Sequence, residues 1–405
     1  MLFSEEAIRA AFPALVQQQQ QQGGQVLLDN AGGSQALGSV ADSVRDYLAG
    51  ARVQLGASYA ASRACAARFA AAHDAAARFV NARAVDEVVF GPSATQLLRN
   101  LSQALDFRPG DELVVSAIDH EANVAPWLDL ARRQDLVVRW WRPPPDTPDP
   151  HLRPEQLAAL LSPRTRLVAF THASNVLGTI TDVRAVADEA HKVGALVCVD
   201  GVAFAPHRPV DVQALGVDMY VFSWYKVFGP HVATLYASWG AQAQLRSLGH
   251  FFNPSLTLAD KLGLSAASYE LCQAVTHVVD YLGPSPASDM WSAIVGHEYK
   301  LQSALLAALR DMPACTIYGV PQADPHLRVA TVSFTVRDWD SKDFVEAVEK
   351  VSNYGFRWGA FYSSRLVRDT LRLGEHGVVR VSMVHYNTMD EVNGLIKVLE
   401  RVVSR

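Results

Sequence analysis

The chain contains the run Leu196-Val197-Cys198-Val199-Asp200-Gly201, in which an acidic residue follows four apolar residues. A short, continuous apolar run of this kind is typical of a strand that is buried on both faces of a parallel sheet. Open α/β sheets bind their ligands at the carboxyl ends of such strands. We therefore interpret Asp200 as a candidate site residue, although an aspartate in this position is about as often a turn former or a helix cap.

A second apolar run, Met219–Phe222, leads directly into Ser223-Trp224-Tyr225-Lys226. A lysine that follows a buried strand is costly to desolvate as an ammonium unless it is paired or used covalently. A Schiff base with a carbonyl cofactor removes that cost. Pyridoxal phosphate (PLP) also needs a carboxylate beside its pyridine nitrogen, and Asp200 could supply it. Lys226 and Asp200 together therefore indicate a PLP site.

Further polar residues are predicted at the same sheet edge. Gly91-Pro92-Ser93-Ala94-Thr95 lies where a strand gives way to a helix, and helix N-termini bind phosphate, although helix capping explains these residues equally well. His120 follows another strand and could lie on the cofactor ring, whereas a lone histidine is more often structural. Asn175 could reach the ring oxygen. Each signal alone is weak, and their convergence on one edge is the evidence.

The alternation of apolar runs with helical patterns from about residue 60 indicates an α/β fold built on a seven-stranded, mainly parallel sheet. The predicted strands are Glu87–Phe90, Glu112–Ala117, Leu136–Trp140, Leu167–Phe170, Leu196–Val199, Met219–Phe222 and Thr234–Ala237. Helical spacing covers Ala94–Leu105, Val124–Arg133, Pro154–Leu161 and Val183–Val193.

Beyond a helix ending near Asp311, the pattern predicts a smaller α+β domain. Its expected elements are the strand Val329–Val336, the helix Lys342–Tyr354, the strand Val378–Met383 and the helix Met389–Val403. We expect an N-terminal segment over residues 1–30, a large cofactor-binding domain over 31–285 and a small C-terminal domain over 286–405.

The composition favours small-molecule chemistry. A net charge of −5 over 405 residues leaves no basic surplus for nucleic acid or an anionic membrane surface. No apolar stretch reaches the roughly 18 residues of a membrane span. The four cysteines form no CxxC pair, so we predict no metal site and a cytoplasmic location.

Several of these runs together resemble the class V aminotransferase superfamily and, within it, the cysteine desulfurases. They are Asp119-His120 with Ala122-Asn123, Ser174-Asn175-Val176-Leu177-Gly178-Thr179, Val199-Asp200-Gly201 through Lys226, and Arg380-Val381-Ser382. The resemblance covers essentially the whole chain. It implies a PLP-dependent transferase of fold type I that acts on a small-molecule amino acid as a homodimer. The apolar, Ala-rich segment Val53–Phe69 is a candidate arm across the partner, although its periodicity fits an ordinary amphipathic helix of one subunit equally well.

The resemblance also implies a role for each matching residue. Lys226 would carry the cofactor as a Schiff base, and His120 and Asp200 would join it as catalytic residues. The implied cofactor-binding set is Ala94, Thr95, His120, Asn175, Asp200, Ser223 and Lys226. The implied substrate-binding set is Asn175, Arg357, Tyr362 and Arg380, with Arg380 holding the substrate carboxylate.

The chain departs from the desulfurase pattern at the nucleophile. Where desulfurases carry a loop cysteine shortly after Arg-x-Gly, this chain reads Arg357-Trp358-Gly359-Ala360-Phe361-Tyr362-Ser363-Ser364. Ala203 and Tyr225 replace a glutamine and a histidine expected near the cofactor, and Ala266 replaces a phosphate-binding threonine. We therefore predict lyase chemistry, by C–S cleavage or α,β-elimination, without a protein persulfide. Transamination, epimerisation and a catalytically silent binding partner remain as alternatives.

Overall fold

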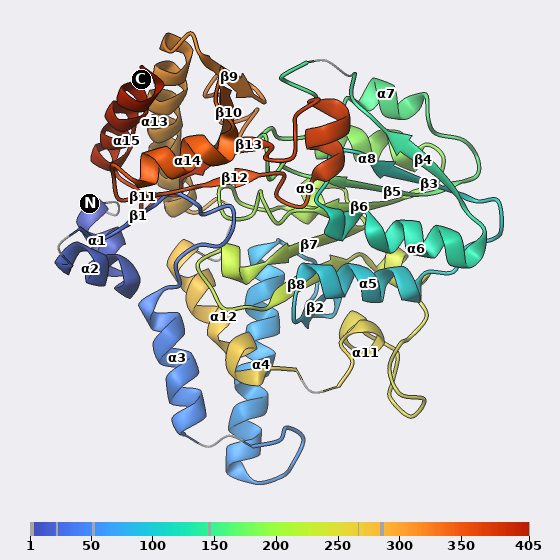
Figure 1. The fold of residues 1–405 in the computed structure, drawn as a ribbon. Helices are drawn as coiled ribbons and strands as arrows, with labels where there is room; N and C mark the ends of the chain where they lie inside the picture. The colour runs from blue at the N-terminus through green and yellow to red at the C-terminus, as the bar shows by residue number, and fades with distance from the viewer. Residues whose placement is uncertain are drawn as a thin grey trace.

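The structure is a computed structural model that describes residues 4–21, 23–50, 53–144, 147–265, 267–283 and 287–404. One side of the molecule consists of a large sheet between layers of helices, and the other consists of a smaller sheet backed by helices (Figure 1). The predicted boundary near residue 285 lies outside the described residues. No helix in the described part of the chain combines the length and the apolar composition that a bilayer-spanning segment needs.

The large sheet has seven strands in the order β2-β8-β7-β6-β5-β3-β4, and β8 is the one described strand that runs antiparallel to its neighbours. This confirms the predicted seven-stranded, mainly parallel sheet. The strands are β2 (Val88–Gly91), β3 (Glu112–Ser116), β4 (Val137–Trp141), β5 (Thr165–Thr171), β6 (Leu196–Asp200), β7 (Met219–Ser223) and β8 (Ala233–Ala237).

Helices bury both faces of this sheet, which explains why its strands are continuously apolar. One face packs against α5 (Ala94–Ala104) and α6 (Ala125–Gln134). The other packs against α8 (Val183–His191) and the end of α4 (Ala60–Phe79).

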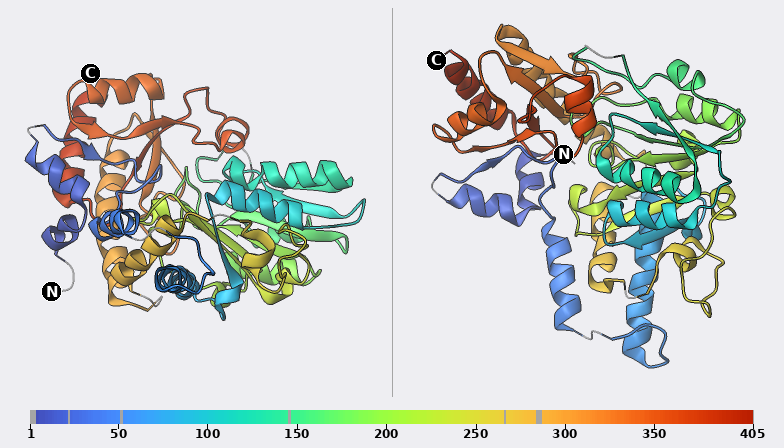
Figure 2. Two further views of the ribbon diagram at one scale, coloured as in Figure 1. Left: turned by 90° about the horizontal axis from the view of Figure 1, so that it is seen from below. Right: turned by 45° about the vertical axis from the view of Figure 1, so that its right-hand side comes forward.

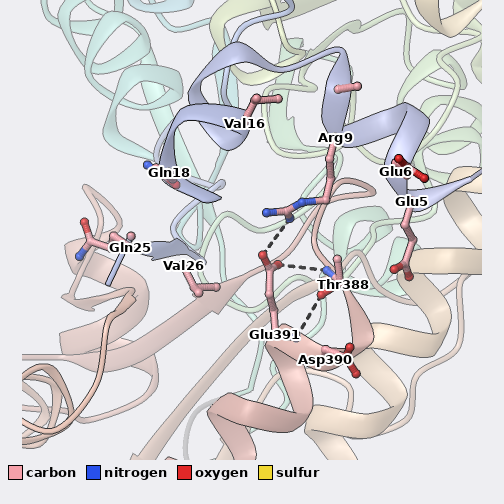
Figure 3. Close-up of a pocket in the computed structure, with 12 residues that line it drawn as sticks. Glu5, Glu6, Arg9, Val16, Gln18, Gln25, Val26, Thr388, Asp390 and Glu391 are labelled. Carbon is pink, nitrogen blue, oxygen red and sulfur yellow. Dashed lines mark hydrogen bonds and ion pairs between the residues drawn. The ribbon is translucent and has the colours of Figure 1, made fainter. Parts of the chain in front are cut away.

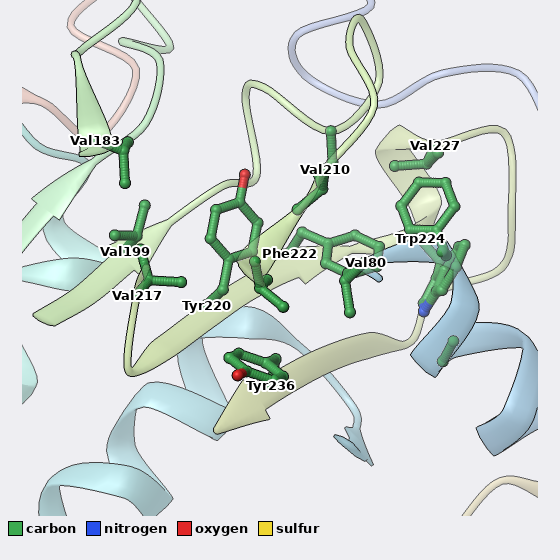
Figure 4. Close-up of a cluster of buried hydrophobic side chains, with 14 of the residues drawn as sticks. Val80, Val183, Val199, Val210, Val217, Tyr220, Phe222, Trp224, Val227 and Tyr236 are labelled. Carbon is green, nitrogen blue, oxygen red and sulfur yellow. The ribbon is translucent and has the colours of Figure 1, made fainter. Parts of the chain in front are cut away.

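The packing on this second face fixes the strand that precedes Lys226. Tyr220, Phe222 and Trp224 alternate along β7 and the turn that follows it, and they lie in one buried cluster (Figure 4). Val221 faces the opposite core. The Trp224 indole also donates a hydrogen bond to Thr234 on β8 at 2.8 Å. Because β7 is packed on both faces, its end has a fixed position at the sheet edge.

The smaller body is a four-stranded antiparallel sheet in the order β12-β13-β10-β9, with helices packed on it. Its strands are β9 (Cys315–Tyr318), β10 (Thr331–Val336), β12 (Arg357–Gly359) and β13 (Val378–Ser382). Its helices are α13 (Asp289–Asp311), α14 (Ser341–Glu349) and α15 (Met389–Val403). The predicted helix Lys342–Tyr354 is too long, because Tyr354–Gly355 forms β11 and pairs with a strand from the N-terminal segment.

The N-terminal segment packs against the C-terminal part of the chain. It consists of α1 (Glu5–Ala10), α2 (Pro13–Gln20) and β1 (Val26–Leu27), and β1 pairs in parallel with β11. A pocket between these elements and the start of α15 contains an ion pair of Arg9 with Glu391 at 2.8 Å (Figure 3). This docking brings Asp29, which follows β1, to the end of β13.

Three helices extend from the body. α3 (Gly38–Ala49) and α4 both pack against α12 (Tyr269–Leu282), and α3 and α4 reach beyond the large sheet (Figures 1 and 2). The predicted arm Val53–Phe69 falls on the loop before α4 and on the first half of that helix.

Candidate active site

A pocket lies at the edge where β5, β6 and β7 end. It is lined by Ser93, Ala94, Thr95, His120, Ala122, Thr171, Asn175, Asp200, Val202, Ala203, Ser223, Tyr225 and Lys226. All seven residues predicted to bind the cofactor are in this set. The structure therefore brings them together, while their individual roles stay predictions.

Lys226 ends a short 3-10 turn directly after β7, and its side chain is buried. Burial and the positive charge of Arg380 lower the pKa of Lys226 to about 8, and the charge of Asp200 opposes this change. An amine with a pKa of about 8 loses its proton at a lower pH than an ordinary lysine does. The neutral amine is the form that attacks a carbonyl. Lys226 thus has the properties that a Schiff-base lysine needs.

Asp200 is the last residue of β6 and is also buried. Its Oδ1 accepts a hydrogen bond from the backbone N–H of Val202 at 2.9 Å, which leaves Oδ2 available for another donor. Burial raises the pKa of Asp200, while this hydrogen bond and the charge of Lys226 act in the opposite direction. A carboxylate in this setting suits a protonated pyridine nitrogen.

The phosphate end of a cofactor would meet the start of α5. The first N–H groups of a helix lack partners within the helix, and they attract anions. Ser93 caps α5, because its hydroxyl accepts a hydrogen bond from the backbone of Gln96 at 3.1 Å. Thr95 has an exposed side chain, and Ser223 is buried at the end of β7. Both hydroxyls line the pocket and fit a phosphate group.

His120 lines the same pocket, and its ring is neutral. Its Nδ1 accepts a hydrogen bond from the backbone N–H of Ala122 at 3.1 Å, so the ring proton belongs on Nε2. Burial and the charges of Lys226 and Arg380 lower the pKa of His120 to about 4. An uncharged, fixed ring in this place is suited to lie against a flat cofactor.

Asn175 links the pocket to the loop Gly359–Ser364. Its Nδ2 donates to the backbone oxygen of Phe361 at 2.9 Å, and its Oδ1 accepts from the hydroxyl of Ser363 at 3.0 Å. Its own backbone oxygen accepts a hydrogen bond from Arg380 at 3.1 Å. Asn175 therefore contacts both the cofactor pocket and the region predicted to bind substrate.

Arg380 and Arg357 are joined by one carboxylate. Asp29 accepts a hydrogen bond from Arg380 at 3.0 Å and forms an ion pair with Arg357 at 2.6 Å. Arg380 is buried, its face lies 3.7 Å from the ring centre of Phe361, and its Nε has no hydrogen-bond partner among the described residues. A Cβ on Gly32 would lie 2.5 Å from the Arg357 guanidinium, so a side chain there would displace Arg357 from its present position. Burial lowers the pKa of Arg380 to about 10, which leaves it charged near neutrality.

Tyr362 lies at the mouth of the site. Its side chain is 76% exposed and is not among the pocket-lining residues. Its ring centre is 5.2 Å from that of His120, and its backbone oxygen accepts a hydrogen bond from Glu121 at 2.8 Å. A role in substrate binding stays a prediction for Tyr362.

Comparison with known proteins identifies the family. The family model described as aminotransferase class V matches residues 26–395. The chain belongs to the class V aminotransferase family. It is 52% identical to the aminotransferase-like protein FGM3 of Gibberella zeae over 99% of each chain. It is 37% identical to the cysteine desulfurase-like protein ustD of Aspergillus flavus, over 99% of this chain and 91% of the relative.

The fold agrees with this membership. The structure of the cysteine desulfurase CsdA from Escherichia coli superposes with a TM-score of 0.84 over 99% of each chain, at 24% sequence identity. The α/β fold of PLP-dependent transferases is thereby confirmed. The family match confirms the predicted family and its cofactor. The protein is a PLP-dependent enzyme of class V.

Sequence reasoning missed two residues of the site region, Asp29 and Ser363. Asp29 follows a short apolar run, Val26-Leu27-Leu28, and this pattern resembles the one that drew attention to Asp200. Ser363 carried no such signal, because its importance depends on how a loop from the small body docks on Asn175.

Proposed function

We propose that this enzyme catalyses α,β-elimination on an amino acid with a sulfur leaving group at Cβ, and that it releases the sulfur as a free small molecule. The observation that carries the proposal is the thiol-free pocket. A desulfurase needs a thiolate that attacks the substrate sulfur. The loop Gly359–Ser364 contains no cysteine, and none lines the pocket among the described residues.

The cysteines elsewhere in the chain are poor substitutes. Cys198 is fully buried in β6, and burial raises its pKa well above the ordinary value. Burial also raises the pKa of Cys272 to about 12 and that of Cys315 to about 11. Cys65 is buried in α4. The Cys198, Cys272 and Cys315 thiols, with these raised pKa values, are almost entirely protonated at neutral pH, so they do not form persulfides readily.

The residues of the pocket suit elimination. PLP, when bound, withdraws electron density from the substrate Cα. Lys226 would hold the cofactor and, as a free amine, would take the Cα proton on Nζ as the sulfur leaves Cβ with its bonding electron pair. Asp200 would accept a hydrogen bond from the pyridine nitrogen, and Arg380 would bind the substrate carboxylate through its planar guanidinium. The remaining unsaturated amine hydrolyses to a keto acid and ammonia.

A panel of sulfur amino acids tests this proposal. Cysteine should yield pyruvate, ammonia and sulfide in equal amounts, while alkylation followed by mass spectrometry should find every cysteine without an added sulfur. A persulfide that forms at the rate of turnover would overturn the proposal. A keto acid that retains its sulfur would show transamination, and racemised substrate alone would show epimerisation. A purified protein with no visible absorbance band would indicate a binding partner without catalytic activity.

We also propose a homodimer in which α4 contributes to the contact. The exposed side chain of Tyr59 and the helical arm that follows it support this assignment. Sedimentation equilibrium should give twice the mass of the 44.1 kDa chain. An active protein that sediments as a single chain would refute it. The division into domains at about residue 285 and a cytoplasmic location stay predictions.

A further inference from the structure

The loop Gly359–Ser364 has an unusual backbone. Phe361 and Tyr362 are consecutive residues with φ angles of 49° and 60°, in the left-handed region that residues other than glycine seldom adopt. Such a conformation persists only where its surroundings hold it in place, and it is concentrated at functional sites. The contacts that hold this loop therefore indicate what it does.

Those contacts are made by residues of the cofactor pocket and its rim. The backbone oxygen of Tyr362 accepts a hydrogen bond from Glu121, next to His120, at 2.8 Å. Asn175 is held from both ends, because its Nδ2 donates to Phe361 at 2.9 Å and its Oδ1 accepts from Ser363 at 3.0 Å. Ser363 is 1% exposed, so water does not compete for its hydroxyl.

This double contact selects one orientation of the Asn175 amide. A side-chain amide presents either two N–H donors or one oxygen acceptor, according to its rotation by a half-turn. The orientation is set by the carbonyl of Phe361, which can only accept and would repel Oδ1 if the amide were reversed, and the Ser363 hydroxyl then restrains the amide by donating to Oδ1. Nδ2 keeps a second hydrogen, which Asn175 can donate to an oxygen in the pocket that it lines.

We propose that Ser363 is a positioning residue that acts through Asn175, by holding the Asn175 N–H donor toward the oxygen substituent of the cofactor ring. The proton affinity of that ring oxygen then depends on how the loop Gly359–Ser364 is docked. The proposal depends on the cofactor site and not on the elimination reaction. It can therefore be tested without any substrate.

The test is a pH titration of the visible absorbance band of the holoenzyme. A hydrogen bond donated to the ring oxygen favours its deprotonated form, so losing the bond should raise the pH midpoint of the spectral change. Ser363→Ala should raise that midpoint by about half a unit to one unit. The titratable groups that line the pocket are His120, Asp200, Tyr225 and Lys226, and the charges of Arg380, Asp29 and Arg357 also act on Lys226; all are unchanged in this variant.

Ser364→Ala is the matched control, because Ser364 is the exposed neighbour in the same loop and makes no side-chain cap. It should titrate like the wild type, and so should Ser363→Thr, which keeps the hydroxyl. If Ser363→Ala does not fold, Ser363→Cys retains nearly the same volume with a weaker donor and should shift the midpoint in the same direction. A Ser363→Ala or Ser363→Cys midpoint equal to that of the wild type would overturn the proposal, as would an equal shift in Ser364→Ala.

Discussion

The two walls of the active site are built differently. One wall consists of the ends of buried strands, where Asp200 ends β6 and Lys226 follows β7 within a few residues. The other wall borders this pocket through Asn175 and consists of Arg380, Asp29 and the loop Gly359–Ser364. Its contacts join positions as far apart in sequence as Asp29 and Arg380. The first wall rests on regular structure and the second on an ion-pair network and a strained loop.

From this difference we expect the wall of strand ends to govern cofactor binding and the wall that contains the loop Gly359–Ser364 to govern which reaction is catalysed. The strand-end wall holds Lys226 and Asp200, which we expect to bind the cofactor, and both follow the family pattern, although Ala203 and Tyr225 beside them do not. The loop wall holds the groups that we expect to meet the substrate, and it lacks the nucleophilic cysteine of the desulfurases. Substitutions in the first wall should therefore affect all chemistry, whereas those in the second should affect substrate binding.

Lys226→Ala should have the largest effect. It removes both the covalent anchor of the cofactor and the amine that carries the proton, so turnover should fall more than about a thousandfold. The visible absorbance band should also be lost, while circular dichroism stays that of the wild type. Lys192→Ala, at an exposed surface lysine, is the control. Near wild-type turnover of Lys226→Ala would show that Lys226 neither anchors the cofactor nor carries the proton.

Asp200→Asn should have the next largest effect, because it keeps the volume of the side chain and removes its charge. The carboxylate matters most when negative charge develops in the cofactor ring, so the loss should fall on kcat and reach about a hundredfold. Cofactor affinity should change far less, and fluorescence titration measures it. Asp188→Asn, at an exposed ion pair, is the control. Weakened cofactor binding with unchanged turnover would show that Asp200 is only an anchor.

Arg380→Lys tests the loop wall. The substitution keeps the positive charge and loses the two-pronged geometry of the guanidinium and its contact with Phe361, so KM should rise roughly tenfold to a hundredfold. The visible absorbance band of the holoenzyme should be retained. Arg357→Lys should raise KM less, because Arg357 is half exposed and contacts the site through Asp29. Equal effects on KM from both variants would show that the two arginines bind substrate jointly.

The strand-end wall could be predicted from sequence, and the loop wall only in part. A buried strand has a local signature, and parallel strands bring their ends to one edge, so Asp200, Ser223 and Lys226 were found together. Arg380 was identified through the family resemblance. Asp29 and Ser363 were not found, because their contacts depend on the docking of distant segments, which no local pattern encodes. The overlong helix at Lys342–Tyr354 has the same cause, since pairing with β1 ends the helical region early.

The lowered pKa of Lys226 predicts how the rate of PLP binding depends on pH, and this rate can be measured without substrate. A neutral amine is needed to capture the cofactor carbonyl, and the amine is neutral above its pKa of about 8. The rate at which PLP binds to the apoprotein should therefore rise about tenfold per pH unit below this pKa and level off above it. Stopped-flow absorbance measures the rate. A rate that continues to rise toward the ordinary lysine pKa would show that burial does not lower the pKa of Lys226.

Tyr362→Phe should have the smallest effect, and it tests what the loop wall contributes to chemistry. The side chain is 76% exposed and lies outside the pocket lining, so its hydroxyl meets water rather than the reacting atoms. A general acid must come within hydrogen-bond reach of the atom that it protonates, and one that does so contributes at least about a hundredfold to the rate. The exposed position instead predicts a change in kcat of less than about twofold on removal of the hydroxyl.

Comparison of Tyr362→Ala with Tyr362→Phe separates the contribution of the ring from that of the hydroxyl. The ring lies against His120 at the mouth of the site, so its loss should raise KM by about threefold through weaker closure over the substrate, with kcat again nearly unchanged. Steady-state kinetics of both variants with the best substrate of the sulfur amino acid panel provide the measurement. A hundredfold fall in kcat for Tyr362→Phe, together with loss of the alkaline limb of its pH profile, would show that the phenol reaches the leaving group when substrate binds. The loop wall would then supply a catalytic proton as well as substrate contacts, and the separation of cofactor chemistry from substrate binding between the two walls would no longer hold.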